Sequence, residues 1–242
     1  PYQRVRTMMQ SFNLHLSSPV KCSYLADQQA SSQVIVPANQ VNASYYGPLL
    51  RQGFRRSGVF VYRPQCAQCR ACQSLRIDVN RFTLSKRFKR IINKNRHLHC
   101  RRLPLRWEEA HFQLYQKYQQ HRHGEVQSEL SMRTDYKEFI LQSYVDSALL
   151  EYRDANHQLK MVSLIDMSDD GLSAVYTFYD PEDKTSLGHY GILCQLDLCK
   201  VAAKPWLYLG YWVEGCQKLN YKMDYQPVEI FRDGTWIPYN RD

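Results

Sequence analysis

Three cysteines stand at two-residue spacing in the segment YRPQCAQCRAC, at Cys66, Cys69 and Cys72. A Cys-x-x-Cys pair places two sulfur atoms on one side of a tight turn, which suits tetrahedral zinc or an iron–sulfur cluster. Structural sites of both kinds take four protein ligands, and Cys22 is the only other cysteine before Cys100. These four thiols, Cys22, Cys66, Cys69 and Cys72, are therefore the candidate metal ligands, and their spacing does not choose between zinc and iron–sulfur.

Two further interpretations of these thiols stay open, namely free thiols in a folded core and a reversible disulfide. The first residues, PYQRVRTMMQSF, contain no continuous apolar stretch, so we expect no export signal and a cytoplasmic location. In that reducing compartment, clustered cysteines serve metal or redox roles more often than structural disulfides. The remaining cysteines are scattered and are interpreted as small buried or surface residues: Cys100, Cys194, Cys199 and Cys216.

The charge of the chain is divided unevenly. Residues 1–106 contain 19 Lys and Arg against two acids, a net charge of +17, whereas residues 107–242 carry a net charge of −8. A half this basic indicates a polyanionic partner, with nucleic acid the leading candidate and a merely solvated basic surface the alternative. No stretch approaches about 18 consecutive apolar residues, so neither a membrane-spanning helix nor a membrane partner is expected.

The densest run of basic residues lies in TLSKRFKRIINKNRHLHC, residues 83–100. Four apolar residues recur there at helical spacing, which predicts an amphipathic helix that packs on the core through that face. They are Phe88, Ile91, Ile92 and Leu98. The cationic face could lie along a phosphate backbone; binding to a membrane surface is the alternative, which the lack of tryptophan on the apolar face disfavours. The candidate phosphate-binding residues are Lys86, Arg87, Lys89, Arg90, Lys94 and Arg96.

The elements that must position these residues change in kind near residue 80. Before it, strands are predicted at Ser32–Pro37, Ser57–Pro64 and Ser74–Val79, the last of them half-buried because its apolar residues alternate. After the basic segment, helices are predicted over Glu108–His123 and over Thr134–Val145, with Thr134 as the N-cap of the second.

The last hundred residues predict the order β-β-β-α-β-α-β-β. Three strands separated by tight turns (ALLEYRD, KMVSLIDMS and GLSAVYTFYD) precede a helix at about 187–203 and a strand at Pro205–Val213. A meander that feeds a helix and then a strand beside the third is the architecture of GCN5-related N-acetyltransferases (GNAT). We therefore predict an α+β fold with an N-terminal cysteine-containing α/β region, residues 1–80, and a GNAT-like mixed-sheet domain that follows the basic helix within residues 81–242.

Three segments carry a resemblance to a known family: CSYL, YYGPLLRQGFRRSGVFVYRPQCAQCRACQSLRI, and GLSAVYTFYDPEDKTSLGHYGILCQLDLCK with the later WLYLGYWV. They resemble the aminoacyl-tRNA–protein transferases related to eukaryotic arginyl-tRNA–protein transferase, in the short bacterial leucyltransferase branch. The resemblance runs from about Cys22 to about Phe231. It departs from the eukaryotic pattern at two positions. Where that pattern has a second cysteine, this chain has Leu25, and where that pattern has two adjacent cysteines, this chain has Cys69 followed by Arg70.

The resemblance implies transfer of leucine from leucyl-tRNA to the N-terminal Asp or Glu of substrate proteins, which creates a degradation signal. The donor ester is already activated, and the acceptor α-amine, with a pKa of about 7.7–8.0, is partly neutral at cellular pH. The chemistry therefore requires no cofactor and no Ser/His/Asp arrangement. It requires positioning, exclusion of water and stabilisation of an oxyanion.

Three groups of candidate site residues follow from the resemblance. Residues 1–80 would recognise the acceptor, whose carboxylate suits arginine forks, through Arg55, Arg56, Tyr62 and Arg76. The crevice of a GNAT-like domain would hold the aminoacyl end, at Tyr176, Phe178, Tyr208, Tyr211 and Trp212. The candidate catalytic residues are Tyr179, Asp180 and Ser186, although Asp180 also suits a turn before proline and Ser186 opens a helix whose amides could receive an anion.

Alternative functions stay open at this point. Arginyl transfer to the same acceptors would require an acid at the base of the donor pocket, whereas leucyl transfer would require an apolar pocket. An N-acetyltransferase of GNAT fold is a second alternative, but KTSLGHYG is a poor version of the loop that binds coenzyme A. A non-catalytic, metal-containing nucleic-acid-binding protein is the third.

Overall fold

The computed structural model describes residues 3–6, 11–124 and 128–240. Its strands are β1 (Gln3–Arg6), β2 (Ser11–Leu16), β3 (Val20–Lys21), β4 (Gln29–Ala30), β5 (Ser32–Ile35), β6 (Arg55–Ser57), β7 (Phe60–Pro64), β8 (Gln73–Asp78), β9 (His99–Leu103), β10 (Ser147–Arg153), β11 (Leu159–Met167), β12 (Gly171–Tyr179), β13 (Trp206–Trp212), β14 (Val228–Arg232) and β15 (Thr235–Tyr239). The helices are α1 (Ala43–Arg51), α2 (Lys86–Asn95), α3 (Glu109–His123), α4 (Glu129–Tyr136) and α5 (Leu187–Val201), with shorter turns η1 (Ala38–Gln40), η2 (Lys137–Leu141) and η3 (Gln217–Tyr225).

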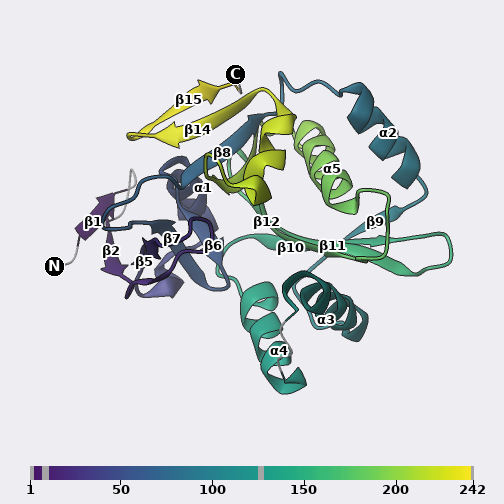
Figure 1. Ribbon diagram of the computed structural model, residues 1–242, viewed down its shortest axis with the longest axis horizontal. Helices are drawn as coiled ribbons and strands as arrows, with labels where there is room; N and C mark the ends of the chain where they lie inside the picture. Colours follow the sequence, from purple (N-terminus) through teal and green to yellow (C-terminus); the bar gives the residue numbers. More distant parts are fainter. Residues whose placement is uncertain (1–2, 7–10, 125–127, 241–242) are drawn as a thin grey trace.

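The first sixty or so residues form a small five-stranded sheet of order β1-β2-β5-β7-β6, which lies at one end of the molecule with α1 (Figure 1). Phe12, Ile35 and Phe54 are buried in its core. The strand predicted at Ser57–Pro64 is confirmed over Phe60–Pro64, which is β7, but Ser57 belongs to β6, because the chain turns at Gly58 (φ +56°) and forms the β6–β7 hairpin. The glycine inside the apolar run marks that turn.

The larger sheet has the order β15-β14-β8-β13-β12-β11-β10-β9. Strands β10, β11 and β12 form an antiparallel meander, α5 follows, and β13 pairs parallel to β12. The predicted α+β fold with a GNAT-like mixed sheet is confirmed. Strand β8 lies inside this sheet between β14 and β13, and its four middle residues are all buried, so the prediction of a half-buried strand is wrong. The boundary at residue 80 stays a prediction.

Helices cover both faces of the large sheet: α5 and α2 on one side, α3 and α4 on the other (Figure 1). The helix predicted over residues 83–100 is shorter. It begins after Ser85, whose hydroxyl accepts a hydrogen bond from the Phe88 amide, and it ends at Asn95, after which the chain enters β9. Asn95 is buried and donates to the carbonyl of Thr185, so its side chain ties the helix end to the start of α5. Among the described residues, no helix is long and apolar enough to cross a membrane.

The helix predicted from Thr134 begins earlier. Ser128 is its N-cap and accepts a hydrogen bond from the Ser131 amide, so Thr134 lies inside α4 and is not the cap. The helix then loosens into the π-turn η2, which ends at Leu141. Tyr136 and Ile140 are fully buried in the core beneath the sheet, and this packing decides where the helix lies.

An acidic residue buried on β10, the strand next to the edge strand β9 of the large sheet, predicts a pH dependence of stability. Glu151 on β10 binds Arg101, Arg153 and His111 at 2.6, 2.9 and 2.8 Å. Burial would raise the pKa of its carboxyl, but hydrogen bonds from Arg153, Arg101 and His111 lower that pKa to about 2. The carboxylate therefore stabilises the fold above its unfolded pKa of about 4.3, and this contribution is lost as pH falls toward 2.

We expect the unfolding free energy of wild type to exceed that of Glu151→Gln most at neutral pH, with a difference that shrinks between about pH 4.3 and 2. Urea unfolding of both proteins across this range measures it. Parallel pH profiles for the two would contradict the assignment.

Candidate active site

The two central strands of the large sheet separate in its middle. Strands β12 and β13 pair only from Gly171 to Ser173, against Trp206 to Tyr208. Where this pairing ends, each of the two strands has a β-bulge. In β12, Val175 is an extra residue relative to β11, and in β13, Leu209 is an extra residue relative to β8. Bulges bend a strand and increase its twist. The paired bulges therefore hold the strands apart at the place where the GNAT-like order predicts a crevice.

A cavity of about 420 Å³ occupies this opening. Helix α5 contributes Gly188, Ile192 and Gln195, whose spacing puts them on one helical face. Val175 and Leu209, the two bulge residues, also line it. Its basic lining residues are Arg55, Arg122, Lys218 and Lys222, and no Asp or Glu stands among the described residues that line it. The cavity is thus part apolar and part cationic.

Arg55 reaches this cavity from the N-terminal sheet. Its Nη2 donates to the carbonyls of Ala174 (2.9 Å) and Val175 (3.4 Å) at the bulge of β12. Gly210 (φ +79°) gives it passage, because a β-carbon there would lie 1.3 Å from Arg55 Nη1. The predicted acceptor-binding residue Arg55 is therefore held in the gap between the separated strands.

Lys222, on η3, supplies a second cation beside Arg55. Its side chain is buried, and Nζ donates to the Tyr211 carbonyl at 2.5 Å. Burial, with a smaller contribution from the Arg55 charge, lowers the pKa of this ammonium to about 7. An ammonium buried beside a guanidinium is costly unless an anion joins them.

Gln195 brings an unused amide to the same cavity. The residue is fully buried, and neither Nε2 nor Oε1 has a hydrogen-bond partner among the described residues. Buried polar atoms in native proteins are almost always paired. The amide therefore offers the donor group Nε2 and the acceptor Oε1 to a molecule bound in the cavity.

A second hollow of about 430 Å³ continues the cavity toward the N-terminus of α5, where Ser186, Lys184 and His121 line it. Ser186 (φ +64°) is the N-cap but makes no capping hydrogen bond through its side chain. His189 borders both hollows. Its Nε2 lies 3.0 Å from Arg87 Nη2, which can only donate, so this ring nitrogen accepts and Nδ1–H donates to Tyr225 Oη (2.6 Å).

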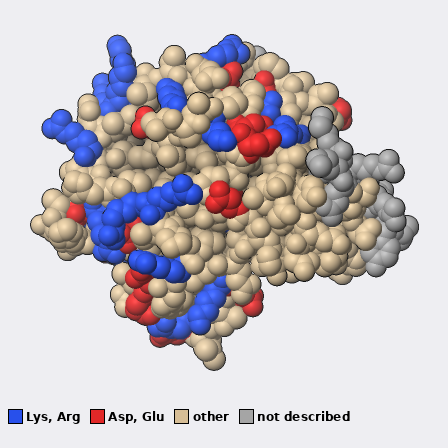
Figure 2. Space-filling view, turned by 180° about the vertical axis from the view of Figure 1, so that it is seen from behind, with Lys and Arg blue, Asp and Glu red and all other residues tan. Residues whose placement is uncertain are grey.

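The basic face of α2 lies next to this region. All six predicted phosphate-binding residues of the helix and its C-cap are exposed: Lys86, Arg87, Lys89, Arg90, Lys94 and Arg96. Arg87 is bound by Asp224 (2.6 Å) and contacts His189. Figure 2, seen from behind, shows Lys and Arg side chains projecting from the upper left, the side on which α2 lies. A cationic surface therefore reaches the mouth of the cavity.

Two other predicted acceptor-binding arginines lie away from the cavity. Arg56 is buried in a bidentate ion pair with Asp166, at 2.6 and 2.8 Å. Arg76 pairs with Glu229 at 2.6 Å, and its guanidinium stacks 3.6 Å above the Trp206 ring. Both arginines are saturated by neighbours of opposite charge or by aromatic rings, so they act in structure.

The predicted aromatic residues divide between the cavity and the packed core. Tyr176 and Tyr179 line the cavity. Tyr176 and Phe178 are two positions apart and share the face of β12 that α3 covers, where both rings contact Tyr115. Phe178 is fully buried there, whereas Tyr176 also reaches the cavity.

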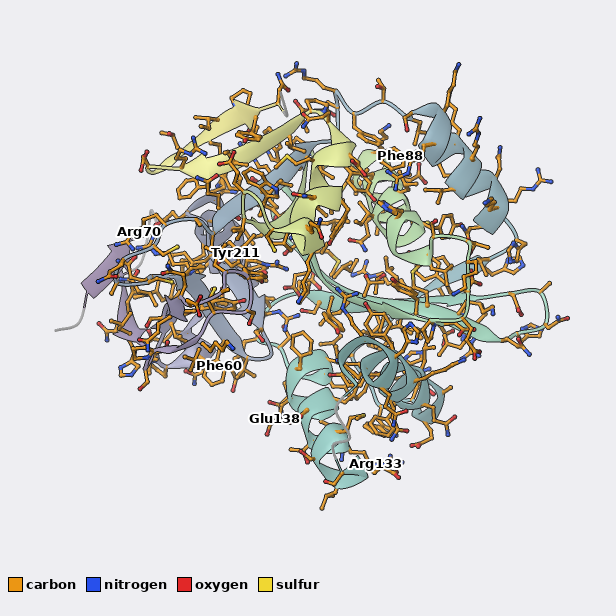
Figure 3. All side chains as sticks on the ribbon, in the orientation of Figure 1. Phe60, Arg70, Phe88, Arg133, Glu138 and Tyr211 are labelled. Atoms are coloured by element: carbon orange, nitrogen blue, oxygen red, sulfur yellow. The ribbon has the colours of Figure 1, made fainter. Side chains whose placement is uncertain are left out.

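Three aromatic residues of β13 also point away from the cavity. Tyr208 packs in the core of the N-terminal sheet, and Trp212 packs on Tyr239. Tyr211 lies where the N-terminal strands meet the large sheet (Figure 3), and its hydroxyl donates to the Gly53 carbonyl. The structure therefore brings none of the three to the cavity.

Asp180 stabilises the turn that follows β12 and does not line the cavity. Its carboxylate pairs with Lys117 (3.0 Å) and Lys160 (3.2 Å) and accepts a hydrogen bond from the Glu182 amide. These partners hold the pKa of the carboxyl below its usual value, against the effect of burial, which would raise it.

The four candidate metal ligands, Cys22, Cys66, Cys69 and Cys72, line one small cavity of about 120 Å³ together with Tyr62 and Tyr211. Two of these thiols accept hydrogen bonds from backbone amides, Cys22 from Tyr24 and Leu25 and Cys69 from Ala71. Burial and then the neighbouring thiols raise the pKa of Cys72 to about 12. Within the described residues, however, no three Cys, His, Asp or Glu side chains are placed to hold one ion. Four thiols are the ligands that a thiophilic metal prefers, but the positions of these side chains do not form a site for one ion.

Several residues of the cavity escape sequence reasoning. Arg122 and Lys222 lie outside the segments that carry the family resemblance, and His189 and Gln195 lie within one of them without being marked as site residues. Helical periodicity alone would have placed Gln195 on the same face of α5 as Gly188. It would not have revealed that this face meets the gap between two strands.

Comparisons with known proteins identify the family. Residues 20–90 match the family model described as Arginine-tRNA-protein transferase, N terminus, and residues 110–232 match its C terminus. The chain is 42% identical over 227 residues to the aspartate/glutamate leucyltransferase of Chromobacterium violaceum, covering 93% of each protein. It is 42% identical to the protein of the same name from Thiobacillus denitrificans, covering 98% of this chain and 95% of the relative.

A solved structure, the L-PGS from Bacillus licheniformis, matches 80% of this chain and 63% of its own with a TM-score of 0.47 and 10% identity. The two family models together match residues 20–90 and 110–232, and each of the two relatives is matched over more than nine tenths of this chain. The chain belongs to the arginine-tRNA–protein transferase family.

Proposed function

We propose that this protein transfers leucine from leucyl-tRNA to proteins that begin with Asp or Glu, which marks them for degradation. Its relatives carry the name aspartate/glutamate leucyltransferase. The observation that carries the choice of leucine is the cavity between β12 and β13. Its walls include Ile192, Leu209 and Val175, and no acid stands among its described lining residues to pair with an arginyl side chain.

The reaction needs no redox step and no cofactor. The acceptor's neutral α-amine attacks the carbonyl carbon of the leucyl ester, a C–N bond forms, and the C–O bond to the terminal ribose breaks. The proton lost by the amine ends on the released ribose hydroxyl. The free amide of Gln195 suits the ester group, with Nε2 donating to the carbonyl oxygen and Oε1 accepting from the leucyl ammonium.

The aminoacylated end of the tRNA would enter along the second hollow. The exposed cations of α2 would contact phosphates further along the acceptor arm. Arg122 and Lys184 line the hollow near the N-terminus of α5, where a terminal phosphate is favoured. The leucyl group would then lie in the cavity between the separated strands, beside Gln195.

The test supplies purified protein with tRNA charged with radiolabelled leucine or arginine, and with peptides that begin with Asp, Glu or Ala. We expect label to move from leucyl-tRNA to the Asp and Glu peptides. Transfer from arginyl-tRNA at an equal rate would contradict the choice of donor. No transfer from either tRNA would contradict the function.

The metal at the four cysteines remains a prediction of the sequence, and its test is separate from catalysis. Anaerobic purification with elemental analysis and an absorption spectrum distinguishes colourless zinc protein from a brown iron–sulfur protein. We expect Cys66→Ala to lower the melting temperature and to leave turnover per folded molecule unchanged, because the site clamps a loop. Loss of turnover in fully folded variant protein would contradict a scaffolding role.

A further inference from the structure

Two cations at the floor of the cavity lack a counter-ion. Arg55 and Lys222 both line it, and neither forms an ion pair within the part of the chain that the structure describes. Other buried cations of the protein differ in this respect, since Arg56 is paired with Asp166 and Arg76 with Glu229. The fold thus pairs its structural cations and leaves these two unpaired.

The hydrogen bonds of both side chains also leave donors unused. Arg55 donates to backbone carbonyls through Nη2, and its Nη1 lies over Gly210, where no side chain blocks the approach. Lys222 donates to one carbonyl, that of Tyr211, although an ammonium carries three donors. Guanidinium and ammonium donors that line one cavity suit a carboxylate, which has two oxygens and one charge.

We propose that Arg55 and Lys222 together bind the side-chain carboxylate of the acceptor's N-terminal Asp or Glu. This inference rests on the proposed function and assigns Lys222 as its specificity-determining residue. The bound carboxylate supplies the missing counter-ion and keeps the Lys222 ammonium charged. An uncharged Asn or Gln side chain cannot do so, and it would leave the buried Lys222 ammonium and the partly buried Arg55 guanidinium without a counter-ion.

The groups around Lys222 are consistent with an anion from outside the chain. Arg55 approaches from β6, and Lys218 and Tyr221 stand on the same element as Lys222. The thiols of Cys216 and Cys72 also lie near its ammonium, but neither lines the cavity. No Asp or Glu stands among the described residues that line the cavity, so none of them is a counter-ion of the kind that Asp166 gives Arg56.

The experiment compares Lys222→Met with wild type, using leucyl-tRNA and two peptides that begin with Asp or Asn. Wild type is expected to favour the Asp peptide strongly in kcat/KM. In Lys222→Met, kcat/KM for the Asp peptide is expected to fall about 100-fold, with little change for the Asn peptide, because truncating one partner of a buried charge pair removes that discrimination. Lys200→Met, which removes an exposed charge outside the cavity, controls for the loss of tRNA affinity.

The outcomes separate this inference from the proposed function. Equal losses for both peptides, or no loss for either, would overturn the role of Lys222 while leucyl transfer stands. A wild type that transfers to neither peptide would overturn the proposed function itself. Melting temperatures are measured first, and Lys222→Gln replaces the methionine variant where that variant does not fold.

Discussion

Replacing Gly210 with alanine is expected to abolish most transfer activity and to lower the free energy of unfolding by about 1–3 kcal/mol. The new β-carbon would lie 1.3 Å from Arg55 Nη1, so the guanidinium must leave the gap between the separated strands. The backbone adds its own cost, because φ at this residue is +79°, a conformation that favours glycine. The added methyl group would thus strain β13 and also displace Arg55, which together with Lys222 is proposed to bind the acceptor carboxylate.

Gly215→Ala is the matched control for this variant. Gly215 has nearly the same backbone angle, φ +77°, but an added β-carbon meets nothing within 4 Å. We expect the backbone strain in Gly215→Ala to lower the free energy of unfolding by a similar amount, and we expect this variant to keep its activity. Activity is measured as leucyl transfer to an Asp peptide, and stability by urea unfolding. Equal activity in the two variants would refute the passage of Arg55 over Gly210.

Replacing Asp166 with alanine is expected to destabilise the protein by about 3–5 kcal/mol. Asp166 lies on β11 and is fully buried, and Arg56 reaches it from β6 in the N-terminal sheet. Tyr46 and Ser147 also donate hydrogen bonds to the carboxylate, at 2.9 and 2.6 Å. Its removal leaves the Arg56 guanidinium charged and buried without a counter-ion, in the contact that joins the small sheet to the large one.

The control for Asp166 is an exposed ion pair of the same kind. Asp169 binds Arg51 at 2.9 Å, but 61% of its side chain is accessible to water. We expect Asp169→Ala to cost less than about 1 kcal/mol, because water replaces the lost partner. Guanidinium unfolding of both variants measures the difference. A cost for Asp166→Ala as small as that for Asp169→Ala would contradict a buried, uncompensated Arg56.

The arginines show how far sequence reasoning reaches in this protein. The family resemblance, together with the affinity of arginine for carboxylates, indicated that Arg55, Arg56 and Arg76 could hold the carboxylate of the acceptor. Arg55 and Arg56 are neighbours in one strand, so their side chains leave on opposite faces. Arg55 therefore enters the cavity and Arg56 enters a buried ion pair. Only the packing of the small sheet against the large one decides which of the two faces meets the cavity and which meets Asp166.

The elements themselves were predicted where their patterns are local. The basic helix, the three-stranded meander and the later parallel strand follow from apolar periodicity and turn residues, which act over a few neighbours along the chain. The hairpin at Gly58 and the start of α4 at Ser128 were missed, because in both places an apolar or capping pattern has more than one possible register.

The sequence by itself determined the family, the α+β class and the uneven distribution of charge, since long motifs, the order of local patterns and composition carry these without coordinates. Tertiary structure alone decided the site. Arg55, Gln195 and Lys222 come from segments up to 167 positions apart and meet only because bulges at Val175 and Leu209 hold two strands apart. Such a meeting depends on which side chains stay unpaired once the core is packed, and no local pattern records that.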